Sequence, residues 1–385
     1  MGMNKFPYFT EEHEAVRDIA RGAAEEFKKT AAEADKNHDY KIIEKNLKRL
    51  AELNLIGIHL PAEFGGEGLD LVGHFVALEE VSKGCLSTAF SYNTQRLGMD
   101  AIRLGGSDAQ KKKYLIPACA GSIVSFATTE PEAGSDVAAI KTTAVKDGDK
   151  WVINGTKHYI TNGIIADVHV LIAKTSAPDA PKAAFTAFIV DADNPGVKMS
   201  KVENKMGATA SPTTEYFLED CRVADDAVLG PIGGGMPLAL SALEIARIGI
   251  GTQGLGLMQV ALEQAIAYGK ERVQFGRPIL KNQALQFHIA NMSSRVEIAR
   301  NLLFHAAWLK DQGLPAGKEA AIAKLFATEE CTWVCNMAMN ILCGPGYTTD
   351  YPVERFFRDA KVLEMGGGTS EIMRMIISRE EIGKF

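Results

Sequence analysis

The chain has 385 residues, more than one hydrophobic core usually accommodates, so two or three domains are expected. Hydrophobic residues make up 46% and charged residues 23% of the sequence, which is typical of a soluble globular protein. The net charge of -6 argues against nucleic acid or an acidic membrane as the main partner. No apolar run is long enough for a transmembrane helix, and the first residues lack an export-signal pattern. We therefore expect a cytoplasmic protein.

The first part of the chain has the periodicity of helices. From Val16 to Phe27, apolar residues recur at the spacing of one face of an amphipathic helix. Similar patterns predict further helices over residues 41–53, 70–83, 86–104 and 108–119. Together these segments form a predicted N-terminal all-α domain, residues 1–121.

Near residue 122 the pattern changes to short runs rich in β-branched residues. Strands are predicted over residues 123–129, 150–153, 168–173, 184–191, 197–203 and 214–218. Asp147-Gly148 and Asn154-Gly155 are tight-turn sequences, and we expect a turn at each of them. The spacing predicts a middle β-domain, residues 122–233, with an antiparallel, barrel-like sheet.

Helical periodicity returns at Gly234. Four helices with apolar stripes are predicted over residues 236–271, 279–312, 317–342 and 369–381. Short loops join them, which predicts a C-terminal α-helical bundle over residues 234–385. The expected fold class is α+β multidomain: an N-terminal helical domain, a middle antiparallel β-barrel-like domain and a C-terminal four-helix bundle.

The six cysteines are scattered along the chain, and none belongs to a Cys-x-x-Cys pair. Cys331 and Cys335 share a helical face, but no histidine accompanies them at the spacing of metal ligands. Buried free thiols in a reducing cytosol are the favoured interpretation, and no metal site is predicted.

Polar groups that suit a ligand gather in three segments. The turn Thr128–Asp136 offers hydroxyls and backbone N–H groups to a planar polar ring or a phosphate. Tyr159-Ile160-Thr161-Asn162 places an aromatic ring beside a hydroxyl and an amide. Gly366, Gly367 and Gly368 precede a Thr-Ser-Glu helix start, which is compatible with a hinge or with an anion site. The motifs of Rossmann, P-loop, serine-hydrolase and zinc-protease sites are absent from the sequence.

Taken together, these segments resemble the acyl-CoA dehydrogenase family from about Phe9 to Ile382. The motifs that carry the resemblance stand in the family's order, and they are Phe126-Ala127-Thr128-Thr129-Glu130-Pro131, Gly134-Ser135-Asp136, Asn154-Gly155-Thr156-Lys157, Tyr159-Ile160-Thr161-Asn162, Asp220-Cys221-Arg222-Val223, Arg272-Val273-Gln274-Phe275-Gly276, Arg358-Asp359-Ala360-Lys361 and Gly368-Thr369-Ser370-Glu371-Ile372. The resemblance implies FAD as cofactor, a CoA thioester as substrate, a homotetramer, and electron transfer to an electron-transferring flavoprotein.

The resemblance also implies roles for single residues. Those that would contact FAD are Phe126, Thr128, Thr129, Tyr159, Thr161, Arg272, Phe275, Gln283, Asn340, Gly344, Thr369 and Glu371. Among them, Arg272, Phe275 and Gln283 would reach the FAD of a neighbouring subunit. Those that would contact the substrate are Ser135, Glu244 and Arg247 for CoA, and Phe90, Ser91, Asn93 and Thr94 for the acyl group. The family usually carries Trp at Tyr159, Gln at Asn340 and Gly at Cys343.

The family's reaction removes the proton alpha to the thioester carbonyl while a hydride leaves the beta carbon for flavin N5. In most members the proton acceptor is a glutamate two residues before the Thr of the Gly-Thr-Ser segment, and here that residue is Gly367. In another branch it precedes the arginine that matches Arg247, and here that residue is Ala246. For Glu364, Glu244 and Glu371 nearby, structural, CoA or cofactor contacts are favoured, so the proton acceptor is not identified.

Three hypotheses follow from the missing glutamate. The favoured one is an oxidoreductase on an acyl-CoA, cyclic or unsaturated, that does not need the usual base. The second is a lyase that removes a sulfinate group from an acyl-CoA. Such relatives carry an arginine where this chain has Phe90, although Arg96 lies six residues on. The third is a catalytically inactive homologue that binds FAD or CoA.

Overall fold

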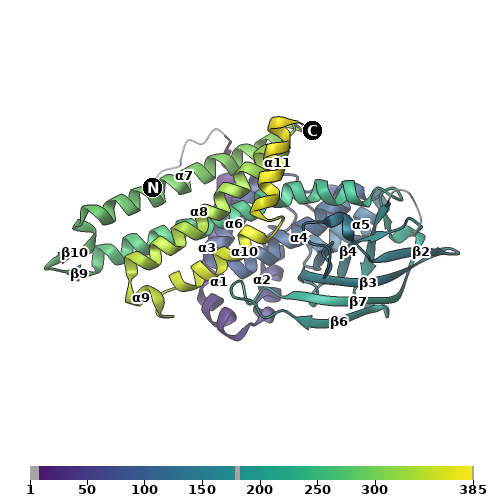
Figure 1. Ribbon diagram of the computed structural model, residues 1–385, viewed down its shortest axis with the longest axis horizontal. Helices are drawn as coiled ribbons and strands as arrows, with labels where there is room; N and C mark the ends of the chain where they lie inside the picture. The colour runs from purple at the N-terminus through teal and green to yellow at the C-terminus, as the bar shows by residue number, and fades with distance from the viewer. Residues whose placement is uncertain (1–7, 178–182, 384–385) are drawn as a thin grey trace.

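The computed structural model describes residues 8–177 and 183–383, and Figure 1 shows their arrangement. A β-sheet occupies one end, the N-terminal helices fill the middle, and the long C-terminal helices extend to the opposite end (Figure 1). The predicted fold class, α+β with a helical, a β and a helical domain in chain order, is confirmed. The division at 121/122 and 233/234 stays a prediction.

Five helices form the N-terminal part. They are α1 (Glu11–Asn37), α2 (Tyr40–Glu52), α3 (Leu71–Gly84), α4 (Leu86–Gly105) and α5 (Asp108–Cys119), with one 3-10 turn, η1 (Ala62–Phe64). Four of the helices begin at a polar residue whose side chain accepts a first-turn N–H, namely Thr10, Asp39, Asp70 and Ser107. Helix α3 is buried on nearly all sides, because α1 and α4 pack on it together with two bundle helices.

The middle part is an eight-stranded sheet in the order β6-β7-β3-β2-β4-β5-β8, with β1 beside β4. Its strands are β1 (Val124–Ala127), β2 (Thr143–Asp147), β3 (Lys150–Thr161), β4 (Val168–Lys174), β5 (Phe185–Asp191), β6 (Val197–Val202), β7 (Thr213–Ala224) and β8 (Val228–Leu229). Short 3-10 turns lie between strands at η2 (Val137–Ala139) and η3 (Asp225–Ala227). Most neighbouring strands are antiparallel, but β1 and β2 each pair with β4 in parallel.

One of the two predicted tight turns is confirmed and the other is wrong. Asp147-Gly148 joins β2 to β3, and Gly148 has a φ of 64°. Asn154-Gly155 lies inside β3, where the pairing with β7 shifts register. At Gly155, with φ of 154°, an added Cβ would lie 2.3 Å from the Oγ1 atom of Thr142. This glycine therefore serves a β-bulge and a close approach of two strands, not a turn.

The C-terminal part contains three long helices and three shorter ones. They are α6 (Gly235–Glu271), α7 (Gln283–Asp311), α8 (Gly317–Leu342), α9 (Gly344–Tyr347), α10 (Val353–Met365) and α11 (Ser370–Ile382). Between α6 and α7 the chain forms a small hairpin, β9 (Val273–Gln274) and β10 (Arg277–Pro278), and a 3-10 turn, η4 (Ile279–Lys281). Helix α6 is the axis of the molecule, because α3, α4, α7, α8 and α10 all pack against it.

The prediction of four long bundle helices missed α10, which carries the glycine run at its C-terminal end. Its buried residues Val353, Phe356, Ala360 and Leu363 follow a helical spacing that the sequence already contained. One hydrophobic core runs through the N-terminal helices and the bundle, whereas the outer part of the sheet has a smaller core of its own. The position of α10 in the larger core fixes where the glycine run lies.

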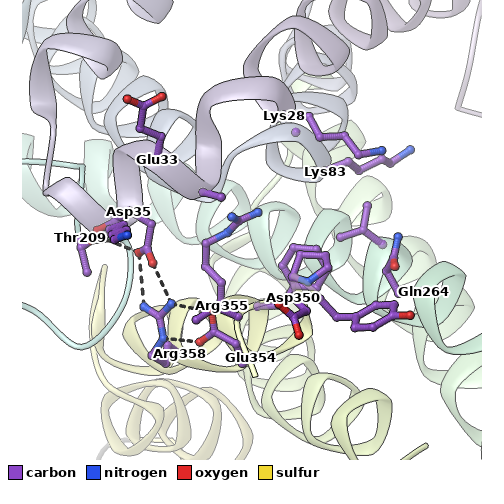
Figure 2. A pocket seen from close by; sticks show the side chains of 18 of the residues that line it. Lys28, Glu33, Asp35, Lys83, Thr209, Gln264, Asp350, Glu354, Arg355 and Arg358 are labelled. Atoms are coloured by element: carbon purple, nitrogen blue, oxygen red, sulfur yellow. Dashed lines mark hydrogen bonds and ion pairs between the residues drawn. The ribbon is translucent and has the colours of Figure 1, made fainter. Parts of the chain in front are cut away.

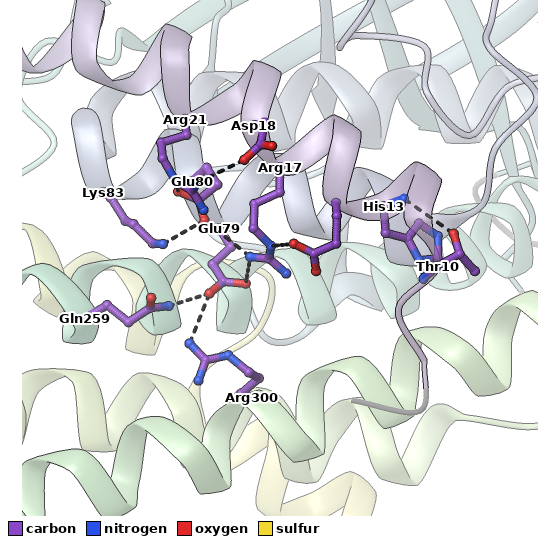
Figure 3. Close-up of polar contacts among 11 residues, drawn as sticks. Thr10, His13, Arg17, Asp18, Arg21, Glu79, Glu80, Lys83, Gln259 and Arg300 are labelled. Carbon is purple, nitrogen blue, oxygen red and sulfur yellow. Dashed lines mark hydrogen bonds and ion pairs between the residues drawn. The ribbon is translucent and has the colours of Figure 1, made fainter. Parts of the chain in front are cut away.

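A network of buried charges ties the N-terminal helices to the bundle (Figure 3). Glu79 on α3 accepts from Arg17 on α1 at 3.4 Å, from Arg300 on α7 at 3.2 Å and from Gln259 on α6 at 2.5 Å. Burial raises the pKa of Glu79, but the charges of Arg300, Lys83 and Arg17 outweigh burial and lower that pKa to about 2. The carboxylate therefore stays ionised and holds four helices together.

All six cysteines are free thiols, but the predicted burial is wrong for two of them, because Cys119 is half-buried and Cys343 is exposed after the end of α8. In the described ranges, no helix has both the length and the apolar character needed to cross a lipid bilayer.

Candidate active site

Strands β1 and β3 bring five of the predicted FAD contacts to one edge of the sheet. Phe126 lies in β1, Thr128 and Thr129 follow that strand, and Tyr159 and Thr161 end β3. The backbone N–H of His158 donates to the Thr129 carbonyl at 2.9 Å, which fixes the turn against the strand. Tyr159 has a φ of 56° and its side chain is 62% exposed, so its ring faces outward from this edge.

A buried lysine, which the sequence reasoning did not single out, supports this turn. The ammonium of Lys157 donates to Glu130 Oε1 at 2.8 Å, to the Ile172 carbonyl at 2.7 Å and to the Thr128 carbonyl at 3.3 Å. Burial lowers the pKa of Lys157 to about 8, although the Glu130 carboxylate opposes this shift. Lys157 thereby fixes the backbone from which the Thr128 side chain projects.

Helix α4 supplies the predicted acyl-group contacts, but several of their polar atoms are already used. Ser91 Oγ lies 2.8 Å from Ser211 Oγ, and the Ser91 carbonyl accepts from Asn162 Nδ2 at 2.9 Å. Thr94 Oγ1 donates to the Phe90 carbonyl at 3.0 Å. The two bonds of Ser91 join α4 to Ser211 and to the end of β3, so the residues predicted to contact the acyl group lie close to those predicted to contact the flavin.

The residues Phe90–Thr94 of α4 form one wall of this region, and Asn93 in this wall is fixed by neighbouring side chains. Asn93 Oδ1 accepts from Arg96 at 3.2 Å, and its amide lies flat against Gly249 of α6, where a Cβ would lie 2.1 Å from Oδ1. Arg96 is fully buried and paired with Asp100, which in turn bonds His59 at 3.0 Å. Two guanidinium nitrogens of Arg96 are therefore engaged by Asp100 and Asn93, whereas its buried Nε has no partner among the described residues.

The glycine run lies directly beside this wall. Gly367 has a φ of 66° and Gly368 a φ of 107°, values that a glycine adopts without strain. An added Cβ at Gly366 would lie 3.6 Å from both Phe90 and Ile250, and one at Gly367 would lie 3.3 Å from Ile250. Among the hydrogen bonds of the described residues, none uses the N–H of Gly367 or Gly368. The turn thus presents backbone donors and no side chain.

Two buried cations hold the carbonyl side of this turn. Arg247 Nε on α6 lies 3.4 Å from the Gly367 carbonyl. Lys324 Nζ on α8 donates to the carbonyls of Glu364 and Gly368, both at 2.8 Å. The sequence predicted Arg247 as a CoA contact and gave no role to Lys324. Lys324 could have been noticed, because a lysine among the alanines on the buried face of a helix is rare and usually has a specific partner.

Helix α11 begins immediately after the glycines. Thr369 is its N-cap, and Thr369 Oγ1 accepts from the Ile372 N–H at 3.3 Å. The predicted cofactor contact Glu371 is exposed in the first turn, 3.7 Å from Arg374. Both residues sit beside the turn, but the hydroxyl of Thr369 is already engaged in capping.

None of the three acids near the turn is free to act as a base beside Gly367. Glu364 Oε1 accepts from Thr332 at 2.6 Å and Oε2 pairs with Lys361 at 2.7 Å. Glu244 pairs with Lys310 at 2.9 Å, and Glu371 points to solvent beside Arg374. At the second possible base position, Ala246 is buried and carries only a methyl group.

The remaining predicted contacts lie away from this turn. Those expected at a neighbouring subunit's FAD or at its adenosine diphosphate part are Arg272, Phe275, Gln283, Asn340 and Gly344. They occupy the tip formed by β9, β10 and α9, at the end of the molecule opposite the sheet (Figure 1). Phe275 is 98% exposed there, with a φ of 52°. Ser135, expected at CoA, is exposed on the loop after β1.

A large cavity of about 1060 Å³ lies elsewhere, between the ends of α1 and α3, helix α6 and the start of α10 (Figure 2). Arg358 crosses its floor to Asp35 at 2.7 Å and to Glu354 at 2.8 Å. None of the predicted site residues lines it, so it is not part of the site described above.

The comparisons with known proteins decide the family. Residues 10–122, 125–221 and 233–382 match the N-terminal, middle and C-terminal domains of acyl-CoA dehydrogenases. The chain belongs to the acyl-CoA dehydrogenase family. A relative described as probable acyl-CoA dehydrogenase YngJ of Bacillus subtilis is 41% identical over 96% of this chain and 98% of its own.

Two solved structures are similar over their whole length. A chain in the structure of the electron transferring flavoprotein of Acidaminococcus fermentans has a TM-score of 0.94 at 41% identity and covers 100% of both chains. Butyryl-CoA dehydrogenase from Megasphaera elsdenii has a TM-score of 0.94 at 34% identity and covers 99% of this chain and 100% of its own.

Acyl-CoA dehydrogenases are FAD-dependent flavoproteins, and the site described above fits that cofactor. The buried hydroxyls of Thr128 and Ser370 have no partner among the described residues, so each is available to a ligand. The exposed ring of Tyr159 stacks on His158 with 3.9 Å between ring centroids, and the His158 N–H bonds to the turn that carries Thr128 and Thr129. Thr128, Tyr159 and the start of α11 would hold the flavin part.

Proposed function

We propose that this acyl-CoA dehydrogenase is an FAD-dependent oxidoreductase for a CoA thioester, cyclic or unsaturated, that releases its proton without a carboxylate at position 367. The observation that carries the proposal is the glycine turn itself. Its carbonyls are bonded by the buried side chains of Arg247 and Lys324. However, Gly367 and Ala246 leave both usual base positions without a proton acceptor.

The unpaired N–H groups give this turn a part in the reaction. A backbone donor fixed beside the substrate stabilises the negative charge that grows on the thioester oxygen as the C–H bond breaks. The N–H of Gly367 is free to donate to that oxygen, because no described residue accepts it. FAD, when bound, would supply the hydride acceptor at N5 for the carbon–carbon double bond that forms in the acyl group.

The space around Gly367 favours a broad acyl group. A glutamate at this position would stand against Ile250, where the added Cβ alone comes within 3.3 Å. With glycine, the wall consists of Ile250 and the edge of Phe90, both apolar and partly or fully buried. A cyclic acyl group would use the space that a glutamate side chain would otherwise fill. An activated C–H in that ring would lose its proton more readily than the C–H of a saturated linear chain.

We propose an electron-transferring flavoprotein as the electron acceptor, as the family resemblance implies. The similar Acidaminococcus fermentans structure is named for an electron transferring flavoprotein, which supports this proposal. We also propose a homotetramer, because the exposed tip residues Arg272, Phe275 and Gln283 lie far from their own Thr128 edge. The lyase alternative has less support, since Arg96 is buried and its guanidinium pairs with Asp100.

An anaerobic titration with a panel of thioesters tests the proposal. Bleaching of the flavin by cyclic or unsaturated acyl-CoAs, with products identified by mass spectrometry, is the expected result. Sulfite release without bleaching would instead establish the lyase. A protein that retains no FAD and responds to no thioester would establish an inactive homologue.

A further inference from the structure

Three carbonyls around the glycine run are held by two cations from two different helices. Lys324 of α8 takes those of Glu364 and Gly368, and Arg247 of α6 takes that of Gly367. Helix α10 ends at Met365, so its last carbonyls have no partner within the helix and form the negative end of its dipole. Cations at this place are therefore favourable, and here they also pin the turn to the bundle.

Burial of the charged Lys324 side chain costs folding free energy. Its side chain is fully buried, and none of the described carboxylates forms an ion pair with it. The charged groups that face it are Glu364 of α10, Glu371 of α11, Glu329 of α8 and Arg247 of α6, and the Glu364 carboxylate is taken by Thr332 and Lys361. A buried ammonium without a paired carboxylate lowers the stability of the fold, whereas an apolar side chain of similar size would not. The presence of a lysine here therefore suggests that its hydrogen bonds have a function.

The need arises from the glycines. Three consecutive glycines have more backbone freedom than any other tripeptide, so the turn would not hold one conformation by itself. The Gly366 N–H is fixed by the Val362 carbonyl at 2.9 Å, and the Gly367 carbonyl is fixed by Arg247. The peptide group that carries the Gly367 N–H lies between these two points, and a planar trans peptide leaves its direction little freedom. Lys324 fixes the carbonyl before the glycines, that of Glu364, and the carbonyl at their end, that of Gly368.

We propose that Lys324 is a positioning residue that keeps the N–H groups of Gly367 and Gly368 in place for the thioester oxygen. This inference rests on the proposed function, because it assigns a task to the same turn. The Lys324 ammonium donates to the carbonyls of Glu364 and Gly368, so its effect on the N–H groups passes through these carbonyls.

The test uses the FAD-loaded protein and butyryl-CoA labelled with ¹³C at its carbonyl, a thioester that the missing base leaves unreacted. Difference infrared spectra report the carbonyl stretch, which moves to lower frequency when a donor polarises the oxygen. Wild type and Lys361→Met are expected to lower this frequency equally, because Lys361 pairs only with the Glu364 carboxylate on the surface. Lys324→Met is expected to bind within about threefold of wild type but to lose most of the lowering. Its turnover of whichever thioester bleaches the flavin should fall by about 10- to 100-fold.

The outcomes separate the two proposals. A Lys324→Met protein that binds butyryl-CoA and keeps the full lowering overturns the role of Lys324 and leaves the proposed function intact. A wild type without any lowering overturns the part assigned to Gly367, and with it this inference. If Lys324→Met does not fold, a pH titration of wild type decides. Burial lowers the pKa of Lys324 to about 8, so the lowering should weaken from pH 7 to pH 9. A frequency that does not change over that range contradicts the role.

Discussion

Replacing Gly367 by glutamate should restore the missing proton acceptor. The change places a side chain on a residue with φ of 66°, which costs about 1–2 kcal/mol in an L-residue. The added Cβ meets Ile250 Cγ1 at 3.3 Å, the end of a side chain that can turn away by a few tenths of an ångström. Against a folding free energy of about 5–15 kcal/mol, the variant should fold and bind FAD.

The expected gain is set by what a positioned base contributes. General base catalysis is worth about 10²–10⁴-fold in rate, so Gly367→Glu should bleach the flavin with butyryl-CoA faster than wild type by about that factor. Anaerobic stopped-flow absorbance at the flavin band measures the rate. Gly367→Gln is the matched control, because it has the same backbone strain and the same bulk against Ile250 but accepts no proton.

The reasoning would be refuted by a Gly367→Glu protein that is folded and FAD-loaded yet no faster than Gly367→Gln. In that case the turn does not stand where the substrate's proton leaves. Thermal unfolding of both variants should show the same loss of stability relative to wild type, because their strain is the same.

Two further predictions concern stability and cofactor retention. Glu79→Gln should lower the free energy of unfolding at pH 7 by about 1–3 kcal/mol, because Arg17 and Arg300 lose the buried carboxylate that they share. The loss is not larger because Arg17 still pairs with Glu80 and Arg300 still pairs with Glu297. Urea denaturation measures this, and Glu44→Gln, which breaks an exposed pair with Lys48, should change it by less than about 0.5 kcal/mol. Since the folded pKa of Glu79 is about 2, its contribution is complete above pH 4.5 and disappears as the pH falls towards 2, so the difference between wild type and variant should narrow. Equal stability of both variants at pH 7 would contradict the network's role. Phe275→Ser should lose FAD during dialysis while Val273→Ser, on the same exposed hairpin, retains it. Equal retention would exclude Phe275 from the FAD site of a neighbouring subunit.

Local patterns predicted most of the fold. Helices in the first third and strands in the middle follow from residue spacing, because burial of one face imposes a period on the sequence. Asn154-Gly155 was misread for a physical reason: the same glycine that suits a hairpin turn also suits a bulge, and only the contact with Thr142 decides between them. Helix α10 was missed although Val353, Phe356, Ala360 and Leu363 carry its pattern.

The site divides in the same way. The resemblance identified Thr128, Tyr159 and Gly367 because they belong to motifs, and the structure brings the first two together at one sheet edge. Lys157 belongs to the Asn154–Lys157 motif, but the motif does not reveal that its ammonium is buried against Glu130 and two carbonyls. Lys324 stayed unassigned because its partners are the carbonyls of Glu364 and Gly368, and a carbonyl has no sequence signature.

The central claim is that the chain handles an acyl-CoA without a glutamate at position 367. The most direct test is to add butyryl-CoA and a cyclohexene-carboxyl-CoA separately, without oxygen, to the FAD-loaded wild type and to follow the flavin absorbance. We expect the cyclic thioester to bleach the flavin and butyryl-CoA to leave it oxidised. Rapid bleaching by butyryl-CoA would contradict it, because a base would then be present at a place where the described residues offer none.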